Sequence, residues 1–321
     1  MKLTIKKKLL QTSQLIITLA AVFFVIYKLY QFDQWDAFYN HFSQHSPRFG
    51  LILIAQIAFS IGTLSLESLK WQQLTQIIHP LTFKEAFFQV LKGLQAGMIT
   101  PGRLGDPPSR VINLPPEMRS RGLLVSMLGI MIQNIVLGVG AIIGLLCLNR
   151  TIVSDPAMLS KLELLLMKYA GYFVLLILTG QILLLIGVKL LKNINIVQKI
   201  TSFFLYVRKF RYSQIALIIF YTIFKYTVFC FQFWLILYYF GIVTHPSHIA
   251  LVAIYFGGIT ILPSFAVADL GLRGSIGIIL FGLVSGNSIG IVMSVFLLWL
   301  FNLAIPSLIP LVWKKPIMQN G

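Results

Sequence analysis

Long uncharged hydrophobic runs dominate the chain, and short stretches rich in charge, proline and glycine separate them. A helix needs about 20 apolar residues to cross a bilayer, and runs of about this length recur along the sequence. The runs that predict full spans cover residues 10–30, 49–66, 123–148, 169–188, 215–240 and 288–313. The pattern therefore predicts an all-α polytopic membrane protein with about six full spans.

Two further segments, residues 83–114 and 248–284, are apolar but interrupted. Each has an apolar arm, a charged turn rich in proline and glycine, and an apolar return arm. Irregular backbone is tolerated at membrane depth only where protein or a water-filled cavity surrounds it. We predict that both segments are re-entrant helical hairpins, with ordinary loops at the membrane surface as the alternative.

The basic residues indicate which ends of the spans face the cytoplasm. They concentrate in residues 2–8, 70–121, 189–211 and 314–315, so we expect both termini on the cytoplasmic side of the cell (inner or plasma) membrane. The two hairpins then enter from opposite faces. This order predicts one membrane domain built as an inverted repeat, with halves at about residues 1–150 and 151–321, and interrupted segments in corresponding halves are typical of a transporter's substrate site.

Amphipathic stripes predict helices on the membrane surface between some of the spans. Aromatic side chains recur at helical spacing in residues 32–42, which we place on the outer surface, and a basic stripe covers residues 196–211. Trp71, Leu74, Ile77 and Ile78 predict a further surface stripe on the inner face.

The composition excludes a soluble domain, because 57% of the residues are hydrophobic and only 11% are charged. Lysine and arginine number 26 against 9 acidic residues, which gives a net charge of +17. Anionic lipid headgroups account for this excess in the loops, so we expect no nucleic-acid partner. The two cysteines lie in apolar runs and the five histidines lack metal-ligand spacing, so we expect no metal and no cofactor.

The first charged turn, residues 100–110, carries the candidate chemistry. Proline and glycine residues break the helix there and in the second turn, at Pro101, Gly102, Gly105, Pro263 and Gly271. The charged candidates are Arg103, Asp106 and Arg110 in the first turn and Asp269 and Arg273 in the second. An arginine at membrane depth normally pairs with a carboxylate, so we expect Arg103 and Asp106 to approach Asp269 and Arg273.

These residues resemble the signatures of the lysylphosphatidylglycerol synthase transmembrane-region family, the flippase-like domain proteins. Residues 100–110 are similar to the family pattern T-P-G-R-L-G-E-x-x-R, with Asp106 in place of the glutamate. Residues 263–273 are similar to P…G-G-L-G-x-R-E, although Ala268 and Asp269 replace the two glycines and Gly274 replaces the last glutamate. The resemblance implies a lipid-handling membrane domain, and we expect it here without the soluble aminoacyl-transferase domain found in some members.

The first functional hypothesis is a lipid translocase that binds an anionic phospholipid or a polyprenyl phosphate in a polar cavity. Arg103, Arg110 and Arg273 would pair with the phosphate, since a guanidinium matches phosphate oxygens in two-point contact. Asp106 and Asp269 would hold the arginines when lipid is absent or bind a cationic headgroup, and Lys225 is a further base. For each basic residue, a purely structural ion pair is the alternative.

Two other functions stay open. One is a polytopic glycosyltransferase of lipid-linked sugars, for which Asp33 and Asp36 on the first outer loop would be the acids. The other is a non-transporting accessory subunit of a lipid-modifying enzyme. The sequence contains no recognisable catalytic constellation, so we predict that the protein is not an enzyme.

Overall fold

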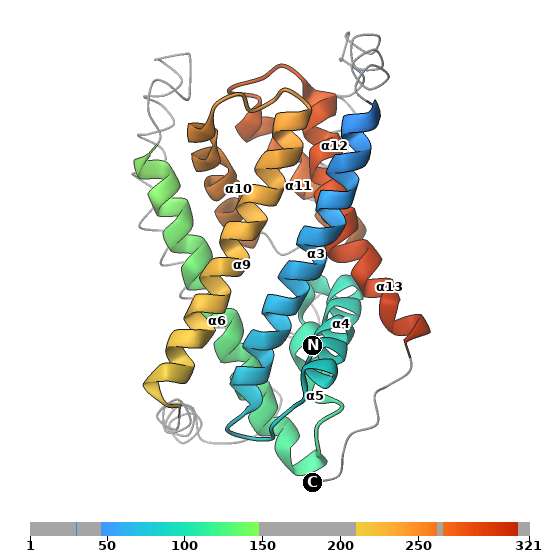
Figure 1. Ribbon diagram of the computed structural model, residues 1–321, viewed down its shortest axis with the longest axis vertical. Coiled ribbons are helices and arrows are strands. Elements are labelled where there is room, and N and C mark those ends of the chain that lie inside the picture. Colours follow the sequence, from blue (N-terminus) through green and yellow to red (C-terminus); the bar gives the residue numbers. More distant parts are fainter. Residues whose placement is uncertain (1–29, 31–45, 148–209, 262–265, 314–321) are drawn as a thin grey trace, which may run out of the picture.

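The computed structural model describes residue 30 and residues 46–147, 210–261 and 266–313 (Figure 1). The elements of this part are all helical. The first group is α3 (Ser46–Thr75), α4 (Phe83–Ile99), η1 (Pro101–Arg103), α5 (Asp106–Val111), η2 (Pro116–Met118) and α6 (Arg119–Leu146). The second group is α9 (Tyr212–Tyr239), η3 (Pro246–His248), α10 (Ile249–Ile261), α11 (Ala266–Phe281), α12 (Ser288–Trp299), the π-helical turn η4 (Leu300–Ala304) and α13 (Ile305–Val312).

Four helices in the described part are long and apolar enough to cross a membrane. They cover Pro47–Thr75, Pro116–Leu146, Tyr212–Tyr239 and Ser288–Val312. The sequence predicted a span at each of these places. The predicted spans at residues 10–30 and 169–188 and the surface helices at residues 32–42 and 196–211 lie, apart from residues 30, 210 and 211, outside the described residues.

The predicted surface stripe after the second span is wrong for Trp71 and Leu74. Both residues continue α3 without a break, and their side chains are buried to 0% and 1% exposure. They are buried because α4 and the start of α6 pack against this end of α3. Apolar side chains at helical spacing therefore mark an internal face of α3.

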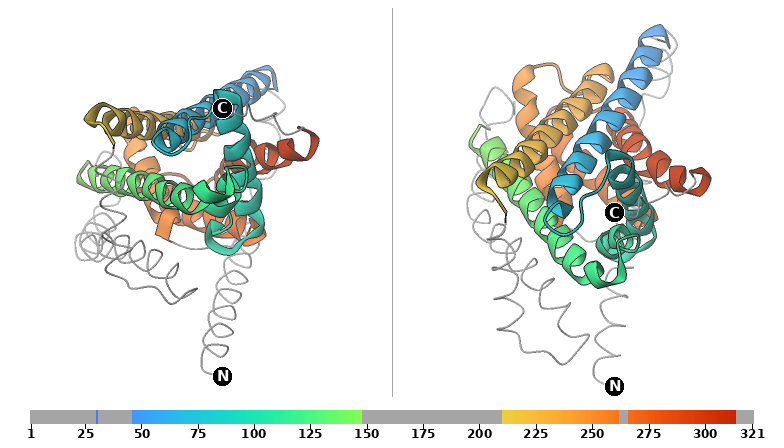
Figure 2. Two further views of the ribbon diagram at one scale, coloured as in Figure 1. Left: turned by 90° about the horizontal axis from the view of Figure 1, so that it is seen from below. Right: turned by 60° about the horizontal axis from the view of Figure 1, so that its bottom comes forward.

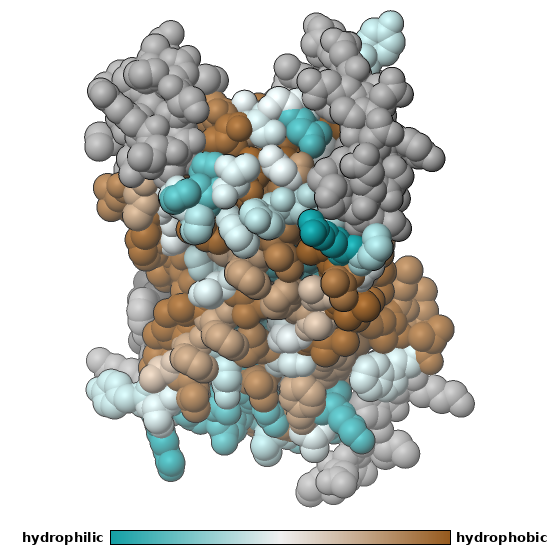
Figure 3. All heavy atoms as spheres, turned by 45° about the horizontal axis from the view of Figure 1, so that its top comes forward, coloured by the Kyte–Doolittle hydropathy of each residue, from teal (hydrophilic) through white to brown (hydrophobic). Residues whose placement is uncertain are grey.

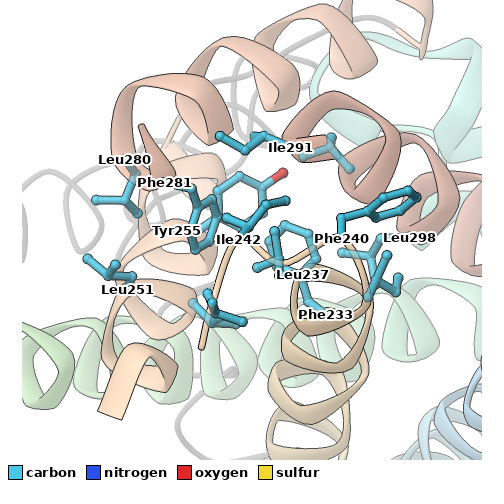
Figure 4. Packing of buried hydrophobic residues seen from close by; sticks show 14 of the residues in the cluster. Phe233, Leu237, Phe240, Ile242, Leu251, Tyr255, Leu280, Phe281, Ile291 and Leu298 are labelled. Atoms are coloured by element: carbon cyan, nitrogen blue, oxygen red, sulfur yellow. The ribbon is translucent and has the colours of Figure 1, made fainter. Parts of the chain in front are cut away.

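Two apolar cores hold the helices together. The lower core lies between α3, α4, α5, α6 and the start of α9, and Trp71 is its largest fully buried side chain. The upper core joins the second half of α9 to α10, α11 and α12, with Phe233, Tyr255 and Phe281 in mutual aromatic contact (Figure 4). Because α9 contributes to both cores, it connects the two ends of the molecule.

The first hairpin consists of α4, η1 and α5. Thr82 begins α4 with a capping box, in which its hydroxyl accepts from the backbone N–H of Glu85 and the Glu85 carboxylate accepts from the N–H of Thr82. Gly102, with a φ of 56°, reverses the chain. Pro107 and Pro108 lie in the first turn of α5, where a helix can lack N–H donors.

The second pair of short helices, α10 and α11, lies at the other end of the molecule from the first hairpin (Figure 1). The expectation that its turn extends to Arg273 is wrong, because α11 begins at Ala266 and includes Asp269, Gly271 and Arg273. Asp269 and Arg273 are one helical turn apart, and their ion pair stabilises the start of the helix. Gly271 is therefore a helical residue, and Pro263 lies outside the described residues.

The described helices expose a broad apolar surface. Figure 3 shows hydrophobic residues over the middle of one face and hydrophilic residues along its lower edge. Large apolar side chains are exposed on α3, α9 and α13, among them Leu51, Ile54, Phe220 and Leu311. A surface of this kind fits a protein whose helices face lipid.

Candidate functional site

The centre of the site is Glu67, a buried carboxylate on the inner face of α3. Its Oε1 accepts a hydrogen bond from Nη1 of Arg110 at 2.8 Å. Its Oε2 lies 2.7 Å from Nζ of Lys70 and 2.7 Å from Nζ of Lys225. One carboxylate thus binds three cations from three helices, α3, α5 and α9, at the level of the membrane-crossing segments.

Arg110 connects Glu67 to the first hairpin. Its Nε donates to Oδ1 of Asp106 at 2.6 Å, and its Nη2 donates to Oδ2 of the same residue at 3.3 Å. The two carboxylates therefore accept from one planar guanidinium, which suits such two-point contact. The guanidinium also lies 5.8 Å from the ring of Trp71, within reach of a cation–π interaction.

The two lysines share a second acceptor on α6. Oε1 of Gln133 accepts from Nζ of Lys70 at 3.2 Å and from Nζ of Lys225 at 3.0 Å. Gln133 and Glu67 therefore hold both ammonium groups between them. The charge cluster, defined as Glu67, Lys70, Asp106, Arg110 and Lys225, contains three cations and two carboxylates and so has one positive charge in excess.

Glycines on α4 let the first hairpin close over this cluster. A Cβ at Gly93 would collide with the Asp106 carboxylate and lie 2.8 Å from Cγ of Arg110. A Cβ at Gly97 would lie 3.3 Å from Nε of Arg103. Figure 2 shows the hairpin, in teal, between the lower parts of α3 and α6. Small residues on α4 therefore determine how closely Asp106 and Arg110 approach.

Arg103 stands at the tip of the first hairpin, in an unusual backbone conformation. Its φ is 59°, in the left-handed region that costs an L-residue roughly 1–2 kcal/mol. Its side chain is 41% exposed, and its Nη2 lies 3.6 Å from Oδ2 of Asp106. The structure thus holds one guanidinium at the open edge of the charge cluster.

Apolar side chains surround this tip. Ile99 is 80% exposed and Leu104 is 57% exposed, one on each side of Arg103 in the sequence. Exposed apolar residues beside a charged turn are expected where the turn borders lipid rather than water. The exposure of these two side chains fits a turn that borders lipid.

The sequence did not predict Glu67 and Lys70 as site residues, and it did not predict the role of Gln133. The predicted span ends at residue 66, so Glu67, which directly follows this apolar run, was assigned to the next loop. The carboxylate itself was the available signal, since an ionisable side chain within a span is almost always paired.

The second predicted turn forms its own ion pair. Nε of Arg273 donates to Oδ2 of Asp269 at 2.7 Å, and the hydroxyl of Tyr255 donates to the backbone carbonyl of Arg273 at 3.4 Å. Among the described residues, the ion pairs of Arg103, Asp106 and Arg110 stay with the first hairpin and Glu67. The expected approach of the two turns is therefore absent from the described ion pairs, and Lys225, predicted only as a further base, joins the cluster instead.

The described residues contain no group of three or more histidine, cysteine, aspartate or glutamate side chains able to hold a metal ion. The site consists of paired cations and carboxylates with the amide oxygen of Gln133, groups that are able to hold a charged ligand. It defines the class of the protein as a helical membrane protein with a polar, positively charged site among its spans. In comparisons with known proteins, no protein-family model and no curated protein matches the chain.

Proposed function

We propose that this protein is a lipid translocase that binds an anionic phospho-headgroup, of a phospholipid or a polyprenyl phosphate, at the charge cluster and Arg103. The observation that carries the proposal is the one positive charge in excess within the charge cluster, in which four side chains are buried and Lys225 is partly buried. Burying an uncompensated charge is costly, and a bound phosphate would neutralise it. The resemblance of residues 100–110 to the flippase-like signature implies the same class of ligand.

Arg103 would make the first contact with the headgroup. Its guanidinium is the most exposed of the cations in this group, and its pairing with Asp106 at 3.6 Å leaves donors free to turn toward a phosphate. Arg110 and Lys225 would then exchange part of their contact with Glu67 for the phosphate oxygens. The acyl or prenyl chains would stay beside the exposed apolar residues Ile99 and Leu104.

In this proposal the first hairpin and the α10–α11 pair are corresponding parts of an inverted repeat. Their opposite positions in Figure 1 and the lengths of α4 and α10, 17 and 13 residues against about 20 for a typical span, support two re-entrant segments. Both termini would be cytoplasmic in the plasma or inner membrane. Asp269 and Arg273 would form the second-half contact for the headgroup.

The test is transport of lipid by the purified protein in vesicles. Vesicles containing a fluorescent phosphatidylglycerol are exposed to a membrane-impermeant quencher, and wild type should make the inner-leaflet fraction accessible. Arg103→Ala should reduce the rate at least tenfold, while Arg121→Ala, which removes an exposed arginine at the start of α6, should leave it unchanged.

Two outcomes would redirect the proposal. If wild type binds lipid but does not move it, the accessory role is favoured. If Arg103→Ala transports at the wild-type rate, Arg103 is only a structural partner of Asp106. The glycosyltransferase alternative depends on Asp33 and Asp36, which lie outside the described residues.

A further inference from the structure

A second polar centre lies on α3 above the charge cluster, and the proposed function does not use it. Gln56 and Gln232 are both 0% exposed and face each other across α3 and α9. Nε2 of Gln56 donates to the backbone carbonyl of Gln232 at 3.5 Å, and Nε2 of Gln232 donates to the backbone carbonyl of Gln56 at 3.4 Å. We call these two residues the amide pair.

The amide pair leaves two acceptors without donors. Neither Oε1 of Gln56 nor Oε1 of Gln232 accepts a hydrogen bond from a described residue, although both atoms are fully buried. An unsatisfied buried carbonyl costs about 1–3 kcal/mol, and leucine in place of both glutamines would avoid that cost. Both oxygens are therefore available to accept from a hydrogen-bond donor or to coordinate a cation.

More oxygens lie one and two turns along the same face of α3. The hydroxyl of Ser60 donates to the backbone carbonyl of Phe301 at 2.6 Å, which leaves the oxygen's lone pairs available. The hydroxyl of Thr63 lies 3.0 Å from the carbonyl of Ser60 and 3.4 Å from Oδ1 of Asn302. Neutral oxygens from α3, α9 and η4 therefore follow one another along the same face of α3.

The helix opposite Ser60 is irregular at this point. Residues Leu300–Ala304 form a π-helical turn, and Pro306 has no N–H for the carbonyl of Asn302, four residues earlier. A π-helical turn inside a helix is frequent at functional sites. In membrane transporters, backbone carbonyls at interrupted helices coordinate Na⁺.

We propose that the amide pair, with Ser60 and the η4 turn, is a binding site for Na⁺. Hard cations prefer oxygen ligands, and every unsatisfied group named here is a neutral oxygen. The absence of a carboxylate among these named groups favours a monovalent over a divalent ion. If the protein transports lipid as proposed above, Na⁺ entry at this site would provide the driving force, and that step alone rests on the proposed function.

The experiment measures Na⁺ binding without lipid. Protein purified in detergent is unfolded thermally in NaCl, KCl or choline chloride at constant ionic strength. The unfolding midpoint of wild type should rise with the logarithm of Na⁺ concentration and stay constant in the other salts. Equilibrium dialysis against radioactive Na⁺ should give about one bound ion per chain for a single site.

Gln56→Leu and Gln232→Leu should each remove the Na⁺ dependence. Gln76→Leu is the matched control, because Gln76 also pairs with an amide of α9, that of Gln214, but at an exposed position. Ser60→Ala provides a milder change, with a weaker dependence expected, should a leucine variant fail to fold. Arg103→Ala should keep the full Na⁺ response, which separates this site from the lipid site.

A wild-type midpoint that is equal in all three salts, with no bound Na⁺ in dialysis, would overturn the proposal. A Na⁺ response that persists in both leucine variants would also overturn it. Failure of lipid transport with an intact Na⁺ response would instead count against the proposed function alone.

Discussion

Replacing Glu67 by glutamine should destabilise the protein strongly, although the side chain keeps its size. Glu67 holds Arg110, Lys70 and Lys225 at 2.8, 2.7 and 2.7 Å. Glutamine removes the negative charge and leaves two buried cations and the partly buried Lys225 with one carboxylate, Asp106. Removing one partner of a buried ion pair costs about 3–5 kcal/mol, and we expect a loss in this range for Glu67→Gln.

The loss should be partly reversed by removing one cation. In Glu67→Gln with Lys225→Met, the excess charge falls and the methionine fills the space of the lysine stem. The double variant should therefore be more stable than Glu67→Gln alone, with an interaction free energy of about 1–3 kcal/mol in a double-mutant cycle.

Unfolding in mixed detergent micelles, followed by far-ultraviolet circular dichroism, measures these free energies. Glu117→Gln is the control, because Glu117 is an exposed acid in η2 and its loss should cost under about 0.5 kcal/mol. A Glu67→Gln variant as stable as this control, or strictly additive single losses, would refute the role of Glu67 as the common partner of the three cations.

Three further predictions concern the first hairpin. Arg103→Gly should keep the free energy of unfolding within about 1 kcal/mol of wild type, because relief of the left-handed φ offsets the lost contact with Asp106. The same variant should abolish lipid transport. A transport rate equal to that of wild type would contradict this prediction. Gly93→Val should cost more than about 3 kcal/mol in the same unfolding assay, because Asp106 and Arg110 occupy the space that the valine side chain would need. The control Gly62→Val, at a position with open space around it, should cost under about 1 kcal/mol. Equal costs would show that the hairpin can shift. Cysteine labelling tests the position of the turn in a background without the two native free cysteines. Leu104→Cys should react slowly with an impermeant maleimide from either side of a vesicle, while Ser120→Cys should react readily from one side. Equal reaction rates would show that the turn is an ordinary loop.

The spans within the described part could be predicted from hydropathy because each is a long run of apolar residues. The start of α5 and the reversal at Gly102 could also be predicted as a break, since proline and glycine limit the backbone locally. The second turn was placed too late because Asp269 and Arg273 were interpreted as loop charges. Their spacing of four residues is equally that of a helical ion pair, and the structure has the helix.

The charge cluster could be predicted only in part. Arg110 and Asp106 lie four residues apart, so their pairing follows from local sequence. Glu67 and Lys225 are 158 residues apart, and their contact depends on how α3 packs on α9. A single sequence contains no signal for that packing, so Lys225 could be suspected as a base but not assigned a partner.

The polar residues of α3 explain why this helix is central to the molecule. Gln56, Ser60, Thr63, Glu67 and Lys70 follow each other at intervals of three or four residues, so they share one face over about 21 Å at 1.5 Å per residue. That face would be costly in an apolar interior unless its groups had partners. The described partners of this face come from α5, α6, α9 and η4. Helix α9 provides a partner at each end of the face, Gln232 for Gln56 and Lys225 for Glu67. Because α3 and α9 share both polar centres, any displacement of one helix against the other would change the amide pair and the charge cluster together.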